Sequence, residues 1–164
     1  MAKTKTRNKN EPQQRTAYTG AILCRTDGVD GDTRQAELSL SSEEPCRRWF
    51  GDEILSHDAG AIDLSRLQEI GVVLFNHDRD RVIGRVLSVR LDEAMRRLRA
   101  VIQFDEDEES ERVYQKVRSG TLKGVSVGYV VDVWEEVKAG ATSTNGRFTG
   151  PCEVATRWTP YELS

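Results

Sequence analysis

Ser126 has the surroundings most favourable to nucleophilic chemistry. It stands in the segment GVSVGY (124–129), inside an alternating pattern that predicts a strand over residues 121–137. Gly124 and Gly128 fall on the same strand face as Ser126, and their missing side chains leave space for another backbone, such as a peptide substrate, to approach the hydroxyl. The GxSxG spacing also occurs at the nucleophile of α/β-hydrolases, but that motif needs a strand–turn–helix, so we reject it here. From the local residues alone, a small polar residue on a tight sheet face is the favoured explanation.

A base for Ser126 has to come from one of two histidines, His77 and His57. A serine hydroxyl is a weak nucleophile until a base takes its proton, and histidine titrates near neutral pH. His77 follows an apolar run in residues 71–75, which predicts a buried strand that delivers the imidazole at its end. His57 lies in the loop-like segment LSHDAG (55–60), which is typical of a surface position. We therefore favour His77 as the base.

An acid that orients the histidine and stabilises its cation would complete a triad. Asp78 is adjacent to His77, but neighbouring side chains on a strand point to opposite faces, so Asp78 would need a turn to reach the ring. Glu162 is remote in sequence, which a folded domain can bridge. The residues themselves leave several acids open: Asp78, Asp80, Glu153 and Glu162.

The composition indicates one soluble globular domain without a metal or cofactor. The 164 residues are 37% hydrophobic and 31% charged, and no stretch approaches the roughly 20 apolar residues of a membrane helix. A net charge of −3 argues against a dedicated nucleic-acid binder, so we expect neither nucleic acid nor a membrane as partner. The three cysteines form no CxxC pair and are predicted to be free thiols in a reducing compartment: Cys24, Cys46 and Cys152.

Residues 1–15 are predicted to be a disordered basic tail, and residues 16–164 a single domain. The tail carries a net charge of +4, which leaves −7 for the rest, and it has almost no apolar side chains to bury. An arm that contacts an acidic partner is the alternative interpretation of this segment.

Strand patterns dominate the remaining chain. A short helix is expected over residues 64–70 with Asp63 as its N-cap, and a firmer one over 105–119 with Val113 and Val117 on its buried face. Because the order is not strictly βαβ, we expect a mainly β fold with flanking helices (β-rich α+β), built as a strongly bent sheet or closed barrel of six or seven strands. The strands are predicted over 17–25, 33–41, 71–78, 81–91, 98–104, 121–137 and 151–164. The expected buried face of the strand 121–137 consists of Val125, Val127, Tyr129, Val131 and Val133.

Four segments in combination resemble the tailed-phage prohead (capsid maturation) serine proteases. The family pattern is an apolar strand ending in Asn-His, an Ile-Gly-Arg/Lys-Val strand, a helix closing on a Gly-x-Leu-x-Gly-x-Ser-x-Gly-aromatic strand, and a later Glu-x-Ser segment. The resemblance covers about residues 50–164, and the stretch RWFGDEILSHDAGAIDLSRL is similar to the version of the family often joined to a major capsid protein. The matching segments are LFNHDRDRVIGRV, DEESERVYQKVRSG, TLKGVSVGY and WTPYELS.

The resemblance implies a fold similar to the herpesvirus assemblin barrel, a small β-barrel surrounded by helices. It assigns Ser126 as nucleophile, His77 as general base and Glu162 as the acid. A variant of this assignment, similar to the herpesvirus enzymes, places His57 in the third role. The implied enzyme is a serine endopeptidase in the host cytoplasm, inside the immature procapsid. It would cleave scaffold regions of the major capsid protein, and itself, and could form a homo-oligomer.

A non-enzymatic scaffold or capsid-assembly module with the same fold is the rival hypothesis. The chain stops at Ser164, immediately after the Glu-x-Ser match. From this we expect a protease domain that was truncated or processed at its C-terminal end.

Overall fold

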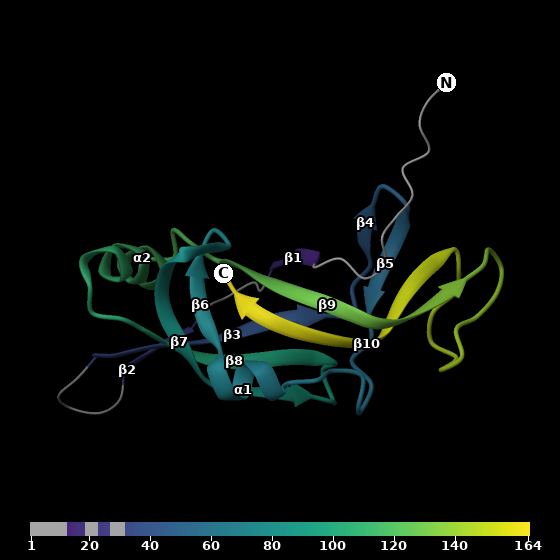
Figure 1. The fold of residues 1–164 in the computed structure, drawn as a ribbon, viewed down its shortest axis with the longest axis horizontal. Coiled ribbons are helices and arrows are strands. Elements are labelled where there is room, and N and C mark those ends of the chain that lie inside the picture. The colour runs from purple at the N-terminus through teal and green to yellow at the C-terminus, as the bar shows by residue number, and fades with distance from the viewer. Residues whose placement is uncertain (1–12, 19–22, 27–31) are drawn as a thin grey trace, which may run out of the picture.

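One curled sheet organises the chain (Figure 1). The computed structural model describes residues 13–18, 23–26 and 32–164. The strands are β1 (Gln13–Tyr18), β2 (Leu23–Thr26), β3 (Asp32–Ser42), β4 (Cys46–Arg48), β5 (Gly51–Leu55), β6 (Val72–Phe75), β7 (Asp78–Asp92), β8 (Arg97–Phe104), β9 (Gly124–Val137) and β10 (Cys152–Leu163). The helices are α1 (Ser65–Ile70) and α2 (Glu108–Arg118).

The sheet follows the order β1-β9-β10-β6-β7-β8-β3-β2, and the β4–β5 hairpin joins it through β5 and β10. Neighbours are antiparallel, except that β10 runs parallel to β5 and to β6. The sheet curls far enough for β3 to contact β9 across its interior. Because β1 and β2, at the two ends of this order, are not paired with each other, the sheet forms a half-barrel.

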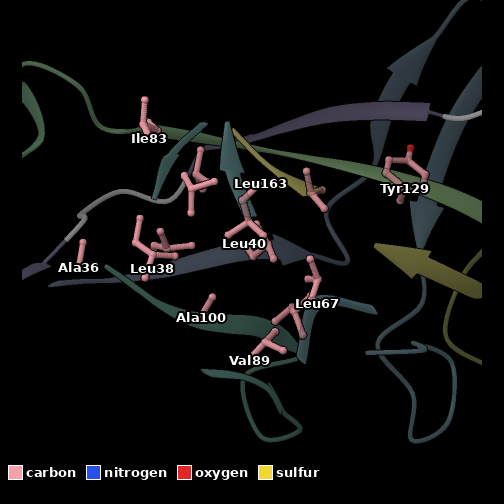
Figure 2. Close-up of a cluster of buried hydrophobic side chains, with 14 of the residues drawn as sticks. Ala36, Leu38, Leu40, Leu67, Ile83, Val89, Ala100, Tyr129 and Leu163 are labelled. Atoms are coloured by element: carbon pink, nitrogen blue, oxygen red, sulfur yellow. The ribbon is translucent and has the colours of Figure 1, made fainter. Parts of the chain in front are cut away.

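The concave face of the sheet encloses the hydrophobic core (Figure 2). Alternation along β3 turns Ala36, Leu38 and Leu40 inward, as the sequence predicts. Burying a leucine of this kind stabilises the fold by roughly 1.5–3 kcal/mol. The largest buried side chain is Trp158 of β10, whose indole N–H donates to the carbonyl of Ser56 at 2.9 Å.

Helix α2 crosses one end of the curled sheet. Its N-cap is Asp107, whose carboxylate accepts hydrogen bonds from the backbone N–H groups of Glu109 and Ser110. Val113 and Val117 are buried, as predicted. The short helix α1 begins at Ser65, with Leu64 rather than Asp63 in the cap position. No helix in the described part of the chain is long and apolar enough to cross a membrane.

The mainly β prediction is confirmed, but several details of it are wrong. The described residues form ten strands and only two helices, so helices do not surround the sheet. The predicted strand 17–25 is divided between β1 and β2, and residues 13–15 of the expected tail belong to β1. The rest of that tail, residues 1–12, lies outside the described residues.

Val133 is the exception on the predicted buried face of β9. Its side chain is 49% exposed, although Val125, Val127 and Val131 are buried. The pairing of β9 with β10 shifts register on both sides of Arg157, the partner of Val133. An irregularity of this kind interrupts the strict alternation of faces on which the prediction depends.

Candidate active site

His77 lies in a two-residue turn between β6 and β7. Phe75 pairs with Asp78 across this hairpin, so Asn76 and His77 alone form the turn. Both residues have positive φ, 56° and 58°, as a type I′ turn requires. The right-handed twist of the flanking strands favours this turn type, and Asn and His tolerate the left-handed region better than most residues. The prediction that the apolar strand delivers His77 at its end is therefore confirmed.

Ser126 lies near the start of β9, and the strand continues past it. The serine is therefore not at a strand–turn–helix junction, in agreement with the rejection of the α/β-hydrolase motif. Its backbone N–H donates to the carbonyl of Ser164 at 2.6 Å, and its carbonyl accepts from the Ser164 N–H at 2.9 Å. Directly opposed residues of an antiparallel pair present their side chains on the same sheet face. Ser126, Ser164 and Glu162 consequently share the face over which the β6–β7 turn lies.

A chain of two short hydrogen bonds joins the three residues. The Nε2 atom of His77 is 2.7 Å from Ser126 Oγ, and its Nδ1 atom is 2.6 Å from Glu162 Oε1. Because an ionised carboxylate can only accept, the ring proton belongs on Nδ1, and Nε2 is left to accept the Ser126 hydroxyl proton. The side chains of His77 and Glu162 are only 17% and 5% exposed, so solvent screens this pair weakly.

Gly128 makes room for Glu162. The two residues pair across β9 and β10, after a register shift between Pro160 and Glu162. A Cβ atom on Gly128 would lie 2.6 Å from Glu162 Cγ and 2.7 Å from its Oε1. A Cβ on Gly124 would meet nothing within 4 Å. The expectation of open space beside the hydroxyl thus holds at Gly124 only, because Glu162 fills the space at Gly128.

Exchanging Gly128 for alanine tests this close approach while all three hydrogen-bonded residues keep their identity. We expect Gly128→Ala to lower the rate of peptide cleavage about 100-fold, since the methyl group displaces Glu162 and with it the imidazole. Gly124→Ala is the matched comparison and should lose several-fold at most, because its methyl group enters open space. Initial cleavage rates at saturating substrate measure both variants. Equal losses in the two would contradict the role assigned to Gly128.

Ser164 is a site residue that the sequence analysis missed. Its hydroxyl accepts a hydrogen bond from the backbone N–H of His77 at 2.9 Å. Ser164, which follows β10, thus holds the turn, and Glu162 within β10 holds the ring. Positive-φ turns persist where the surrounding structure fixes them, and this bond is one such restraint. The signal was available: residues two apart on a strand share a face, which places Ser164 beside Glu162.

Tyr161 immediately precedes Glu162 in β10 and is half-buried. Burial raises the pKa of the Tyr161 hydroxyl, and the negative charge of Glu162 raises it further. The phenol therefore stays neutral through the range in which histidine titrates.

His57 is not part of this constellation, and the prediction that it is a surface residue is wrong. It is 1% exposed, with Nε2 2.8 Å from Ser41 Oγ and Nδ1 2.8 Å from the carbonyl oxygen of Leu55. Both ring nitrogens are thus occupied by structural partners. The loop-like sequence of residues 55–60 hid this burial because the partners of His57 come from β3 and β5.

An ion-pair cluster lies next to His57 and fixes the surrounding loops. Arg147 contacts Glu43 and Asp58, and Glu43 also accepts from the His57 backbone N–H at 2.7 Å. Burial by itself would raise the pKa of the Asp58 carboxyl, but hydrogen bonds from Asn145, Arg147 and other neighbours outweigh it and hold the pKa far below its usual range. Asp58 therefore stays ionised, and the cluster is structural.

The other acids considered as the partner of the His77 ring either lie far from it or form hydrogen bonds with other groups. The Asp78 carboxylate accepts from the backbone N–H of Asp80 at 3.0 Å, at the start of β7. Glu153 pairs with Glu53 at the far end of β10. Nine residues of extended strand, about 30 Å, separate Glu153 from Glu162. Among the described residues, no group of three or more His, Cys, Asp or Glu side chains could hold a metal ion.

The arrangement of His77 and Ser126 agrees with the protein family whose model the chain matches. The family model described as caudovirus prohead serine protease matches residues 47–149, which include both His77 and Ser126. The chain belongs to the caudovirus prohead serine protease family. The resemblance identified from the sequence is thereby confirmed.

One relative of this chain is the major capsid protein of Halomonas phage phiHAP-1. The two are 35% identical over 130 residues, which cover 77% of this chain but only 20% of the capsid protein. The chain therefore corresponds to a small part of that longer polypeptide. No solved structure matches this chain. Glu162 lies beyond the residues that the family model matches, so its assignment depends on the hydrogen bond to His77.

Proposed function

We propose that this chain is a serine endopeptidase that acts in phage capsid maturation, with Ser126 as nucleophile, His77 as general base and Glu162 as the orienting acid. The hydrogen-bond chain from Ser126 Oγ through the imidazole to the Glu162 carboxylate is the observation that carries the proposal. Nucleophile, base and orienting acid stand in the order and at the distances that activate a serine hydroxyl.

The chemistry is acyl transfer in two stages. Ser126 Oγ attacks the scissile carbonyl carbon while its proton passes to His77 Nε2, and Glu162 stabilises the imidazolium that forms. The imidazolium then donates this proton to the leaving amine as the peptide C–N bond breaks. Water, activated by the same imidazole, releases the acyl group and restores the hydroxyl.

The proposed substrates are scaffold regions of the phage's capsid-shell protein, and the polypeptide that contains this chain. Membership of the prohead protease family supports a setting inside the immature procapsid of an infected cell. The relative described as a major capsid protein supports a close link between the protease and the capsid shell.

A non-enzymatic assembly module is the second candidate, and the same relative favours it, because its name describes a capsid protein. The two functions differ in one property, the reactivity of Ser126. A structural module has no reason to keep an activated hydroxyl.

A fluorophosphonate probe tests this difference without a known substrate. We expect the probe to phosphonylate Ser126, detected by peptide mass spectrometry, and His77→Gln to slow labelling at least about 100-fold because the proton acceptor is lost. His57→Gln is the matched control. Its labelling rate per folded molecule should equal that of the unchanged chain. Absence of labelling, or labelling of Ser164 instead, would reject the proposed nucleophile.

A further inference from the structure

A pocket of about 540 Å³ opens beside Ser126 and His77. Its volume falls within the range of protein pockets that bind small organic groups. It extends from the hydrogen-bonded residues into the space between the curled sheet and α2. Leu38, Ile83 and Leu163, labelled in Figure 2, contribute to its wall.

The lining divides into a polar end and an apolar body. The polar side chains all belong to the active site or its turn: Asn76, His77, Ser126 and Ser164. Apart from Gly124, the other lining residues are aliphatic or phenylalanine, and among the described lining residues none is Asp, Glu, Lys or Arg. A side chain that enters past Ser126 therefore leaves polar surroundings and meets hydrocarbon alone.

The α2 wall of this pocket is anchored to the sheet by ion pairs. Arg81 of β7 pairs with Glu109, and Arg34 of β3 pairs with Glu111. Both acids lie in the first half of α2, ahead of Val113 and Val117, which line the pocket. These contacts connect α2 to two different strands, so the pocket is built into the fold.

From these observations we infer that the pocket binds an apolar substrate side chain at one of the two residues that flank the scissile bond. The inference rests on the proposed endopeptidase function, because it is the attacking Ser126 that brings this side chain to the pocket mouth. Leucine, methionine and phenylalanine are the side chains that the lining favours. Acidic and basic side chains are excluded, since burying an unpaired charge among hydrocarbon groups is strongly unfavourable.

A peptide library derived from digested proteins measures this preference directly. The chain is incubated with the library, and mass spectrometry identifies the residues on each side of the new ends. We expect apolar side chains to exceed charged ones about 10- to 100-fold at one flanking position, the range that a hydrophobic pocket provides. Cleavage with no apolar preference at either position would overturn the inference while leaving the proposed function intact.

Leu122 offers a substitution that changes the pocket without disturbing the core. It lines the pocket and is 37% exposed, so Leu122→Asp adds a charge at an accessible edge. We expect the variant to lose most of the apolar preference and to accept lysine and arginine. Leu87→Asp is the matched control, because Leu87 is 42% exposed on β7 outside the pocket, and it should keep the original profile.

The fluorophosphonate probe separates the two possible failures. Normal labelling of Ser126 in Leu122→Asp shows that the variant is folded, so an unchanged cleavage profile would then reject the pocket as the specificity site. Wild-type chain that neither labels nor cleaves would overturn the proposed function and this inference together.

Discussion

Ser126→Ala should abolish peptide-bond cleavage, with a fall in kcat of at least about 10⁴-fold. The reason is chemical: the substitution removes the hydroxyl oxygen that lies 2.7 Å from His77 Nε2 and is proposed to attack the carbonyl, while leaving the ring and its acid in place. Hydrolysis of unfolded casein, followed as new amino termini, measures the loss. The alanine fits a buried strand position, so the variant should fold normally and give an unchanged circular dichroism spectrum.

Ser164→Ala is the comparison that makes this result specific. It removes a neighbouring hydroxyl that holds the His77 backbone and leaves the nucleophile intact. We expect kcat to fall about tenfold, because the substitution misplaces the base but does not remove the nucleophile. A variant pair in which Ser126→Ala remained active and Ser164→Ala did not would exchange the roles assigned to the two serines.

Glu162→Gln should lower kcat about 10²- to 10⁴-fold with little change in stability. Glutamine keeps the shape of the side chain but removes the charge that stabilises the imidazolium, and its amide group can impose the wrong ring tautomer. Because the acid acts through the ring, the loss should appear in kcat more than in KM. The same casein assay at several substrate concentrations separates the two constants.

His57→Gln should show the opposite pattern. Its buried ring bonds Ser41 and the Leu55 carbonyl, so its loss should reduce the free energy of unfolding by about 1–3 kcal/mol, with folded protein turning over normally. Thermal melting and the rate per folded molecule measure these effects. A large loss of turnover for His57→Gln with none for Glu162→Gln would refute the assignment of the acid.

The sequence was informative where the chemistry depends on local order. The face shared by Ser126 and Gly128 follows from the period of a strand, and the position of His77 follows from an apolar run that ends in Asn-His. Helix α2 was equally readable, since its acidic start, Val113 and Val117 are all local signals. These features need no knowledge of which strands pair.

The sequence was uninformative where the result depends on register between distant strands. The partnership of Gly128 with Glu162 requires a register shift near Tyr161 that no composition signal marks. The burial of His57 depends on contacts with Ser41 and Trp158, which the sheet topology brings together. The exposure of Val133 likewise follows from an irregularity opposite Arg157. Each is a tertiary effect that overrides a correct local pattern.

In the proposed endopeptidase, the backbone pairing of Ser126 with Ser164 determines where the negative charge of the tetrahedral intermediate can be stabilised. In chymotrypsin-like proteases the nucleophile's own N–H helps to form the oxyanion hole. Here that N–H already donates to the Ser164 carbonyl, and β1 pairs with the opposite edge of β9, with Thr16 opposite Ser126. The oxyanion must therefore find its donors on a segment other than the Ser126 amide. The scissile carbonyl consequently has to approach Ser126 across the face of the sheet, because both edges of the strand are already occupied.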